Sequence, residues 1–129
     1  MKKCLIDTHT LLWASENSDN LSLPAKEIID LKSNIILISI VSFWEIAIKV
    51  SLGKLQTNIP LNSLKQYLGD TNYSLLHISF EALNRIKSMP FYHRDPFDRM
   101  LIAQAITENI PIVSVDTKFD LYPEIQRIW

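Results

Sequence analysis

Glycine and cysteine are scarce in this chain, and each shortage excludes a class of protein. The 129 residues include two glycines and one cysteine. With so few glycines, no low-complexity tract and no internal repeat, the sequence is not that of a flexible linker, a disordered tail or a repeat array. The single Cys4 excludes a disulfide framework and a zinc site built from thiolates, and its apolar neighbours predict a reduced, buried thiol.

Strong net charge and long apolar runs are also missing. The 13 basic and 14 acidic residues nearly cancel, so the chain lacks the signal of a strongly basic domain, and nucleic acid is neither indicated nor excluded. The N-terminal segment MKKCLIDTHT has only a short apolar stretch before Asp7 and fits neither a signal peptide nor a membrane span. We expect a soluble, cytoplasmic protein with no membrane partner.

The residues that are present fit one domain over residues 1–129, with 47% hydrophobic residues for a core. Runs of strand length cover 3–8, 34–41, 73–79, 110–116 and, more weakly, 124–128. Helical patterns cover 8–16, 24–32, 42–52, 60–69, 79–89 and 95–109. Strands that are apolar on both faces and alternate with helices predict an α/β fold, a three-layer α/β/α sandwich with a parallel sheet of about five strands.

Acidic residues follow the predicted strands, at the edge of the sheet where ligands bind in such folds. Asp7 and Asp116 end two of the strands, and Glu45 falls in the first turn of a helix that begins near Ser42 directly after a third. Asp98 lies in the first turn of its own helix. Because only a short connection joins this helix to the next strand, the start of the helix, and Asp98 with it, is expected at the opposite edge of the sheet. The spacing therefore supports three converging carboxylates and leaves Asp98 open.

Helix capping offers a local explanation for several of these residues. Ser42 and Glu45 have the spacing of a capping box. Asp95 fits an N-cap before a proline, and Asp98 would then meet the positive end of the helix dipole.

Asp7 and Asp116 are less readily explained by local structure. Asp116 could make an Asx turn, but Thr8 is as good a cap as Asp7, which leaves the Asp7 carboxylate without a local task. Clustered carboxylates repel one another unless a cation lies among them, and hard divalent ions such as Mg²⁺ or Mn²⁺ prefer oxygen ligands. A single metal site is the simpler explanation for all the acids together.

The three histidines show no metal-ligand spacing. His9 and His77 are interpreted as structural residues, and His93, in the loop before Asp95, as a substrate contact. Lys49 follows Glu45 by one helical turn, where an ion pair competes with a phosphate contact. The aromatic residues Trp13, Phe43 and Trp44 are expected in the core.

Four motifs make the sequence resemble the PIN-domain nucleases, and among them the VapC-type toxins of toxin–antitoxin modules. They are LIDTHTLLW, SIVSFWEIAIKVSLGKL, HRDPFDRMLIAQA and IVSVDTKFDLY, and they extend over nearly the whole chain. The resemblance implies a single PIN domain over 1–129 whose acidic pocket binds Mg²⁺, with Mn²⁺ as an alternative. The implied catalytic and metal-binding residues are Asp7, Glu45, Asp98 and Asp116, supported by Ser114 and Asp95.

The same resemblance implies a metal-dependent endoribonuclease that a cognate antitoxin blocks and that forms a homodimer. Basic residues around the pocket would then contact RNA phosphates: Lys49, Lys54, Arg94, Arg99 and Lys118. A housekeeping PIN nuclease and a non-catalytic PIN-like RNA-binding module are the alternatives, although the second would be expected to lack one of the four acids. A phosphohydrolase of the Asp-x-Asp type is disfavoured, because DTHT follows the first strand.

Overall fold

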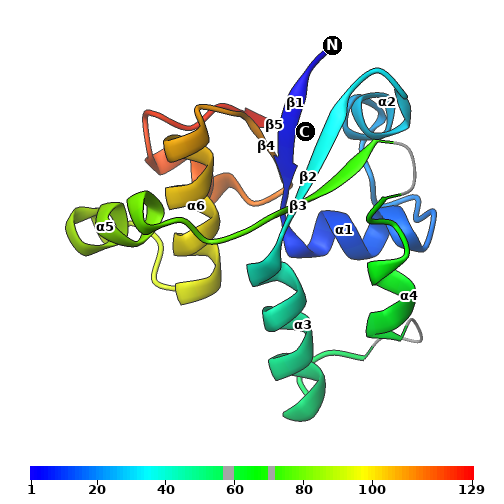
Figure 1. Ribbon diagram of the computed structural model, residues 1–129, viewed down its shortest axis with the longest axis horizontal. Coiled ribbons are helices and arrows are strands. Elements are labelled where there is room, and N and C mark those ends of the chain that lie inside the picture. The colour runs from blue at the N-terminus through cyan, green and yellow to red at the C-terminus, as the bar shows by residue number, and fades with distance from the viewer. Residues whose placement is uncertain (57–59, 70–71) are drawn as a thin grey trace.

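A five-stranded parallel sheet organises the molecule (Figure 1). The structure is a computed structural model that describes residues 1–56, 60–69 and 72–129. The strands are β1 (Lys3–Ile6), β2 (Ile35–Ser39), β3 (Tyr73–Leu76), β4 (Ile112–Val113) and β5 (Arg127–Ile128). Their order is β3-β2-β1-β4-β5, and every neighbouring pair is parallel. This confirms the predicted sheet, including its weak last strand.

Helices follow the strands in the predicted alternation. They are α1 (Thr8–Ser15), α2 (Leu23–Asp30), α3 (Ile40–Ser51), α4 (Leu61–Lys65), α5 (Phe80–Ser88), α6 (Pro96–Glu108) and the short 3₁₀ helix η1 (Thr117–Leu121). The 3₁₀ helix was not expected from the sequence. No helix in the described ranges is long and apolar enough to cross a membrane.

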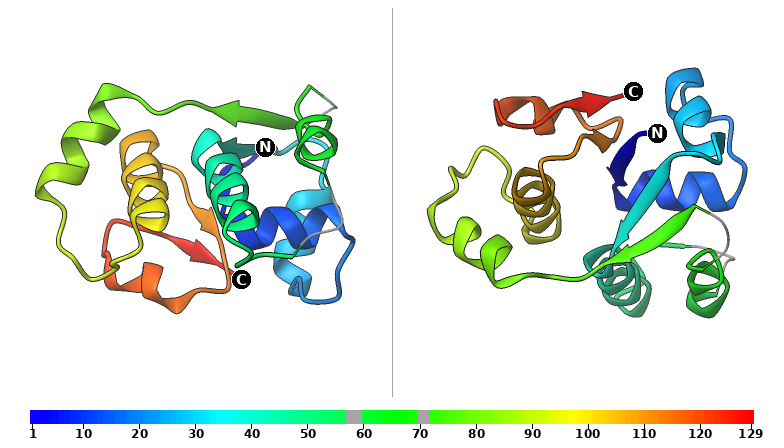
Figure 2. Two further views of the ribbon diagram at one scale, coloured as in Figure 1. Left: turned by 90° about the horizontal axis from the view of Figure 1, so that it is seen from below. Right: turned by 45° about the horizontal axis from the view of Figure 1, so that its top comes forward.

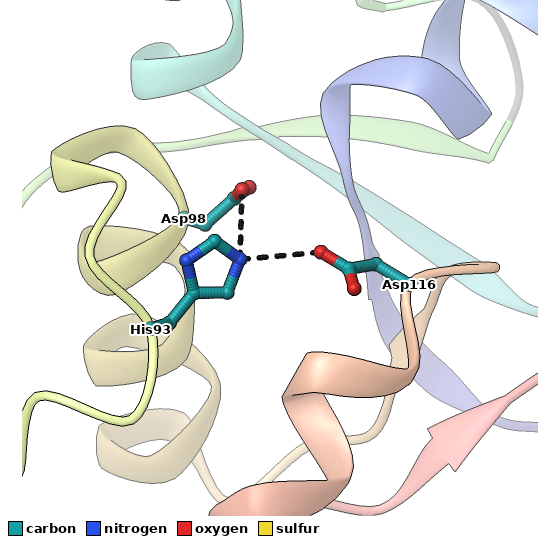
Figure 3. A group of neighbouring side chains, drawn as sticks. All are labelled: His93, Asp98 and Asp116. Atoms are coloured by element: carbon teal, nitrogen blue, oxygen red, sulfur yellow. Dashed lines mark hydrogen bonds and ion pairs between the residues drawn. The ribbon is translucent and has the colours of Figure 1, made fainter.

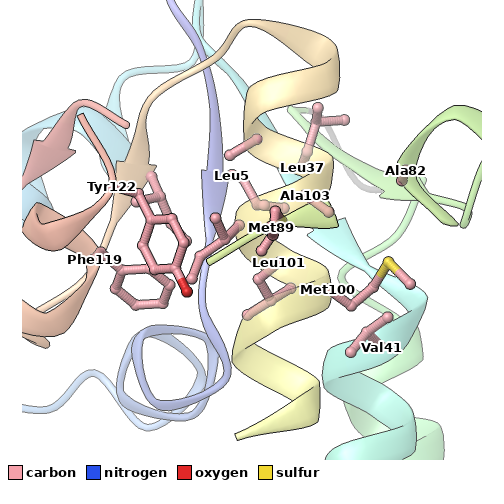
Figure 4. Packing of buried hydrophobic residues seen from close by; sticks show 13 residues of the cluster. Leu5, Leu37, Val41, Ala82, Met89, Met100, Leu101, Ala103, Phe119 and Tyr122 are labelled. Atoms are coloured by element: carbon pink, nitrogen blue, oxygen red, sulfur yellow. The ribbon is translucent and has the colours of Figure 1, made fainter. Parts of the chain in front are cut away.

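Two apolar cores lie on opposite faces of the sheet, which gives the three layers visible in Figure 2. Because side chains alternate along a strand, Leu5 and Leu37 face α5 and α6 (Figure 4), whereas Cys4 and Ile6 face α1, α2 and α4. Burial raises the pKa of the Cys4 thiol to about 11, as a reduced, structural cysteine requires.

The aromatic residues divide between core and surface. The prediction of a core position is confirmed for Phe43, which is buried, whereas Trp13 is only half-buried. The prediction for Trp44 is wrong: its side chain is 57% exposed and packs edge-on against Phe97, with ring centroids 5.1 Å apart. Its face of α3 points away from the sheet, a direction that an all-apolar helix pattern does not reveal.

Strand order changes direction at the centre of the sheet. From β1 the chain proceeds outward through β2 and β3, then returns to place β4 and β5 on the other side of β1. Ligand sites in open parallel sheets lie beyond the carboxyl ends of the strands at such a reversal. The ends of β1 and β4 are therefore where a site is expected.

Candidate active site

Asp7 directly follows β1 and starts α1. Its Oδ1 accepts a hydrogen bond from the Thr10 backbone N–H at 3.0 Å, which makes Asp7 the N-cap. Its Oδ2 accepts one from the Ser114 hydroxyl at 2.6 Å. Thr8, which the sequence offered as an equally good cap, is instead the first helical residue, so the inference that Asp7 has no local task is wrong. Burial raises the pKa of Asp7, and the bonds from Ser114 and Thr10 oppose that shift.

Glu45 reaches the same edge from the second turn of α3. This helix begins at Ile40 because Ser39, the last residue of β2, is its N-cap and accepts from the Val41 N–H at 3.0 Å. The predicted capping box is therefore wrong: Ser42 lies inside the helix. With the cap role removed, Glu45 is a buried carboxylate, 3% exposed.

Two partners hold the Glu45 carboxylate. The Thr8 hydroxyl lies 2.6 Å from Oε1 and 3.1 Å from the Ser42 hydroxyl. The Lys49 ammonium pairs with Oε2, so the ion pair predicted from the helix spacing is confirmed. Although partial burial lowers it, the pKa of Lys49 is raised overall by its bond to Glu45.

Asp98 also lies at the carboxyl edge of the sheet. Its position is the one that the sequence spacing left open. A helix that precedes a parallel strand runs antiparallel to it, so the N-terminus of α6 lies at the carboxyl end of β4, and the expectation of the opposite edge was wrong. Asp95 is the N-cap, as predicted, and its Oδ1 accepts from the N–H groups of Phe97 at 2.8 Å and Asp98 at 3.1 Å. The Asp98 carboxylate is left facing the site.

Asp116 completes the group from the far side, where it follows β4 and caps η1. Its Oδ1 accepts from the Lys118 N–H at 2.9 Å, so the predicted Asx-type contact is present. Its Oδ2 lies 3.2 Å from Nε2 of His93, and Asp98 Oδ2 lies 3.2 Å from the same nitrogen (Figure 3). His93 thus sits between the two aspartates.

Electrostatics at this edge favour a cation. Burial, together with repulsion from Asp95, Glu45, Asp7 and Asp116, raises the pKa of Asp98 to about 8. The other three acids of the predicted site therefore lie near enough to Asp98 to act on its carboxylate. Carboxylate oxygens supported by a hydroxyl are ligands that suit a hard divalent ion such as Mg²⁺ or Mn²⁺, so the residues present fit the expected ion.

The PIN domain family model matches residues 4–125. The chain is a PIN-domain protein. Ribonuclease VapC22 from Mycobacterium tuberculosis is 24% identical to it over 131 aligned residues, which cover 100% of both chains. The family assignment agrees with the resemblance drawn from the four motifs.

Solved structures share the fold of this PIN domain. One is VapBC2 from Rickettsia felis bound to a DNA fragment from its promoter, with a TM-score of 0.72 and 16% identity over 98% of this chain and 97% of that one. Another is VapBC-5 from Mycobacterium tuberculosis, a member of the VapBC family of toxin–antitoxin systems, with a TM-score of 0.64 and 14% identity over 99% and 98%. These likenesses concern the fold.

The basic residues predicted to contact phosphates differ in how exposed their side chains are. Lys54, Arg94 and Lys118 are exposed. A cavity of about 190 Å³ beside Glu45 is lined by Thr8, His9, Leu12, Lys49, Lys54 and Leu55. Its lining thus joins one of the four acids to two lysines that were predicted as phosphate contacts.

Arg99 does not fit the phosphate contact predicted for it. The side chain is 5% exposed and its guanidinium donates to backbone carbonyls, including those of Pro90 at 2.9 Å and Ile86 at 3.2 Å. It also lies over the Phe91 ring, 3.9 Å from the centroid. Arg99 therefore braces the segment between α5 and α6, and this use of a buried arginine cannot be distinguished by sequence spacing from an exposed one.

Proposed function

We propose that this chain is a Mg²⁺-dependent endoribonuclease, active also with Mn²⁺, and the toxin component of a VapBC-type toxin–antitoxin module. The observation that carries the proposal is the convergence of Asp7, Glu45, Asp98 and Asp116 at the carboxyl edge of the sheet, with the pKa of Asp98 raised to about 8. Such mutual repulsion is relieved when a divalent ion binds. The ribonuclease name of its full-length relative supports the substrate class.

In this proposal the four carboxylates hold the ion, which as a Lewis acid would activate water and stabilise charge on a phosphodiester. Ser114 orients the Asp7 carboxylate through the 2.6 Å hydrogen bond. Asp95 supports Asp98 from outside the ligand set by fixing the start of α6. The whole chain, residues 1–129, acts as a single domain.

Substrate binding is assigned to the basic residues that surround the acids. Lys54, Arg94 and Lys118 are exposed, and Lys49 is partly exposed beside the cavity. Ammonium and guanidinium groups bind phosphates largely through charge. The RNA backbone would thus reach the acidic residues past these four basic side chains, which we call the basic rim. Acidic centre and basic rim together account for the near-zero net charge.

A protein partner is part of the proposal. The fold is that of chains in VapBC complexes, and we expect a cognate antitoxin that blocks the site and a homodimer of the toxin, both in the cytoplasm. An exposed apolar stripe along α3 supports a protein contact. It consists of Ile40, Trp44, Ile48 and Leu52, which are 38%, 57%, 39% and 60% exposed.

Cleavage of RNA by the purified chain tests the activity. We expect cleavage with Mg²⁺ or Mn²⁺ and none in EDTA or in the Asp7→Asn variant. Cleavage that persists under both conditions would place the chemistry elsewhere.

Expression tests the biological role. The wild-type chain should arrest growth, and co-expression of the antitoxin from the neighbouring reading frame should relieve the arrest. A soluble, RNA-cleaving chain that is harmless would instead indicate a housekeeping PIN nuclease.

A further inference from the structure

His93 occupies the centre of the Asp98–Asp116 side of the site, a position that its sequence does not suggest. Its side chain is only 6% exposed. Nε2 lies 3.2 Å from one oxygen of each aspartate (Figure 3). The backbone N–H of His93 donates to the Tyr122 hydroxyl at 3.1 Å, and that hydroxyl donates to the Pro90 carbonyl at 2.7 Å. The imidazole is therefore held in place from its backbone.

The second ring nitrogen determines what Nε2 can do. Nδ1 accepts a hydrogen bond from the Asp95 backbone N–H at 3.3 Å. An accepting nitrogen carries no proton, so the proton of the neutral ring is on Nε2. A histidine that binds a metal usually donates its other ring N–H to a carboxylate or carbonyl, whereas here the other nitrogen faces a donor. Nε2 consequently offers a proton, and no lone pair, to the site.

We propose that His93 is a positioning residue, and not a metal ligand: its Nε2–H is shared between Asp98 Oδ2 and Asp116 Oδ2 and holds both carboxylates ready for the ion. The inference rests on the proposed function in that these aspartates bind the ion. When both are ionised, two adjacent carboxylates repel each other and would turn apart without a common donor. Within the described residues, Asp98 Oδ1 has no hydrogen-bond donor, so this arrangement leaves one oxygen of Asp98 open.

This role keeps the ligand set all-oxygen. A nitrogen ligand would shift the preference of the site toward softer transition metals, whereas carboxylates suit Mg²⁺ and Mn²⁺. His93 would therefore determine the geometry of the site and leave its metal preference unchanged.

Nuclear magnetic resonance of the wild-type chain tests the tautomer directly. A long-range ¹H–¹⁵N correlation spectrum should show His93 protonated at Nε2 and unprotonated at Nδ1, in the metal-free chain and with saturating Mg²⁺. Loss of the Nε2 proton when Mg²⁺ is added, or the opposite tautomer in both states, would overturn the inference.

Binding of Mn²⁺ to variants tests the positioning role. His93→Ala should bind Mn²⁺ about tenfold or more weakly, as is typical when a residue that supports ligands is removed. His93→Gln, whose amide nitrogen can take the place of Nε2 as a donor, should recover much of the affinity. His77→Gln, a change at an exposed histidine of the same chain, is the matched control and should bind as the wild type does. An unchanged affinity in His93→Ala contradicts positioning.

Pulsed electron paramagnetic resonance of bound Mn²⁺ separates the two roles. We expect no coupling from a coordinated ¹⁴N in the wild type. Such a coupling, if lost in His93→Gln, would make His93 a ligand and leave the proposed nuclease intact. A wild-type chain that binds neither Mn²⁺ nor Mg²⁺ would overturn the metal dependence of the proposed function and this inference with it.

Discussion

The two halves of the acidic site balance their charge in different ways. In the Asp7–Glu45 half, each carboxylate oxygen has its own partner: a backbone N–H and a hydroxyl for Asp7, and a hydroxyl and an ammonium for Glu45. In the Asp98–Asp116 half, the two aspartates share His93, and repulsion adds to the pKa of Asp98. In the first half, hydrogen bonds from Ser114 and Thr10 oppose the rise that burial causes in the pKa of Asp7, whereas in the second half repulsion adds to the effect of burial on Asp98.

Neutral substitutions should separate the halves most strongly. We expect Asp98→Asn and Glu45→Gln each to lower RNA cleavage by at least about a hundredfold, as removal of one charge-stabilising group typically does. In EDTA near pH 9, however, Asp98→Asn should raise the melting temperature because it relieves repulsion, while Glu45→Gln should not, since it loses the pair with Lys49.

Melting curves and a cleavage assay on both variants decide the matter. The control is Asp19→Asn at an exposed turn, which should match the wild type in both measurements. Equal stabilisation of the two variants would show that the halves do not differ in their charge balance.

The pH dependence of stability and of Mg²⁺ binding should contain a contribution from Asp98 in the second half, and burial raises the pKa of Asp7 in the first half as well. The pKa of Asp98 is about 8 in the folded chain against an ordinary 3.8. Between these two values the metal-free folded chain keeps a proton on Asp98 that the unfolded chain has lost. Its stabilising contribution is present below pH 4 and is lost as the pH rises toward about 8. Mg²⁺ competes with that proton, so its affinity should fall about tenfold per pH unit below 8, to about a hundredth near pH 6.

Calorimetric titration with Mg²⁺ across this range measures the effect. In Asp98→Asn the part of this dependence that Asp98 contributes should disappear, and any dependence that remains is assigned to Asp7, whose pKa burial also raises. A wild-type affinity that does not change with pH would show that Asp98 is already ionised without metal.

The two halves also differ in how far the sequence predicts them. Asp7 and Asp116 could be placed because the ends of parallel strands share one edge. Glu45 lies at the predicted edge, but the helix start predicted at Ser42 is wrong: both serines are buried, and Ser39 is the cap because its hydroxyl accepts from the Val41 N–H.

His93 could not have been placed by spacing. It is a lone histidine whose contact with Asp116 spans 23 residues and depends on how the loop before α6 packs. Its only sequence signal is that it is the first residue of the motif HRDPFDRMLIAQA. The direction of α6 could have been predicted, because a helix between parallel strands runs antiparallel to them; that rule places Asp98 correctly.

Arg99 connects the stability of the fold to the second half of the site. Arg99→Met removes the donor to the carbonyls of Ile86, Met89 and Pro90 and should lower the free energy of unfolding by about 2–3 kcal/mol. Because the segment that it braces carries His93, Mn²⁺ binding should weaken as well. Chemical denaturation and Mn²⁺ titration measure the two effects.

The exposed Arg85 provides the matched control for this substitution. Its side chain donates to the Thr107 hydroxyl at 3.2 Å, and Arg85→Met should change stability by no more than about 0.5 kcal/mol. If Arg99→Met lowered stability but left Mn²⁺ binding unchanged, the contacts of Arg99 would stabilise the fold without affecting the metal site.

The smallest effects are expected on the basic rim, where the two halves should behave alike. Lys54 lines the cavity beside Glu45, and Lys118 follows Asp116, which its backbone N–H contacts. Each side chain is exposed, so Lys54→Gln and Lys118→Gln should leave the melting temperature unchanged. If each lysine contacts one phosphate, each variant should raise KM for RNA a few-fold, leave kcat nearly unchanged, and reduce the slope of log affinity against log salt by about 0.7, the value for single strands.

Lys26→Gln is the control, since α2 lies toward the opposite edge of the sheet (Figure 1) and this change should move neither KM nor the slope. A loss in only one of the two rim variants would mean that RNA enters over one half of the site, and a fall in kcat would mean that the lysine acts on the carboxylates and not on the substrate.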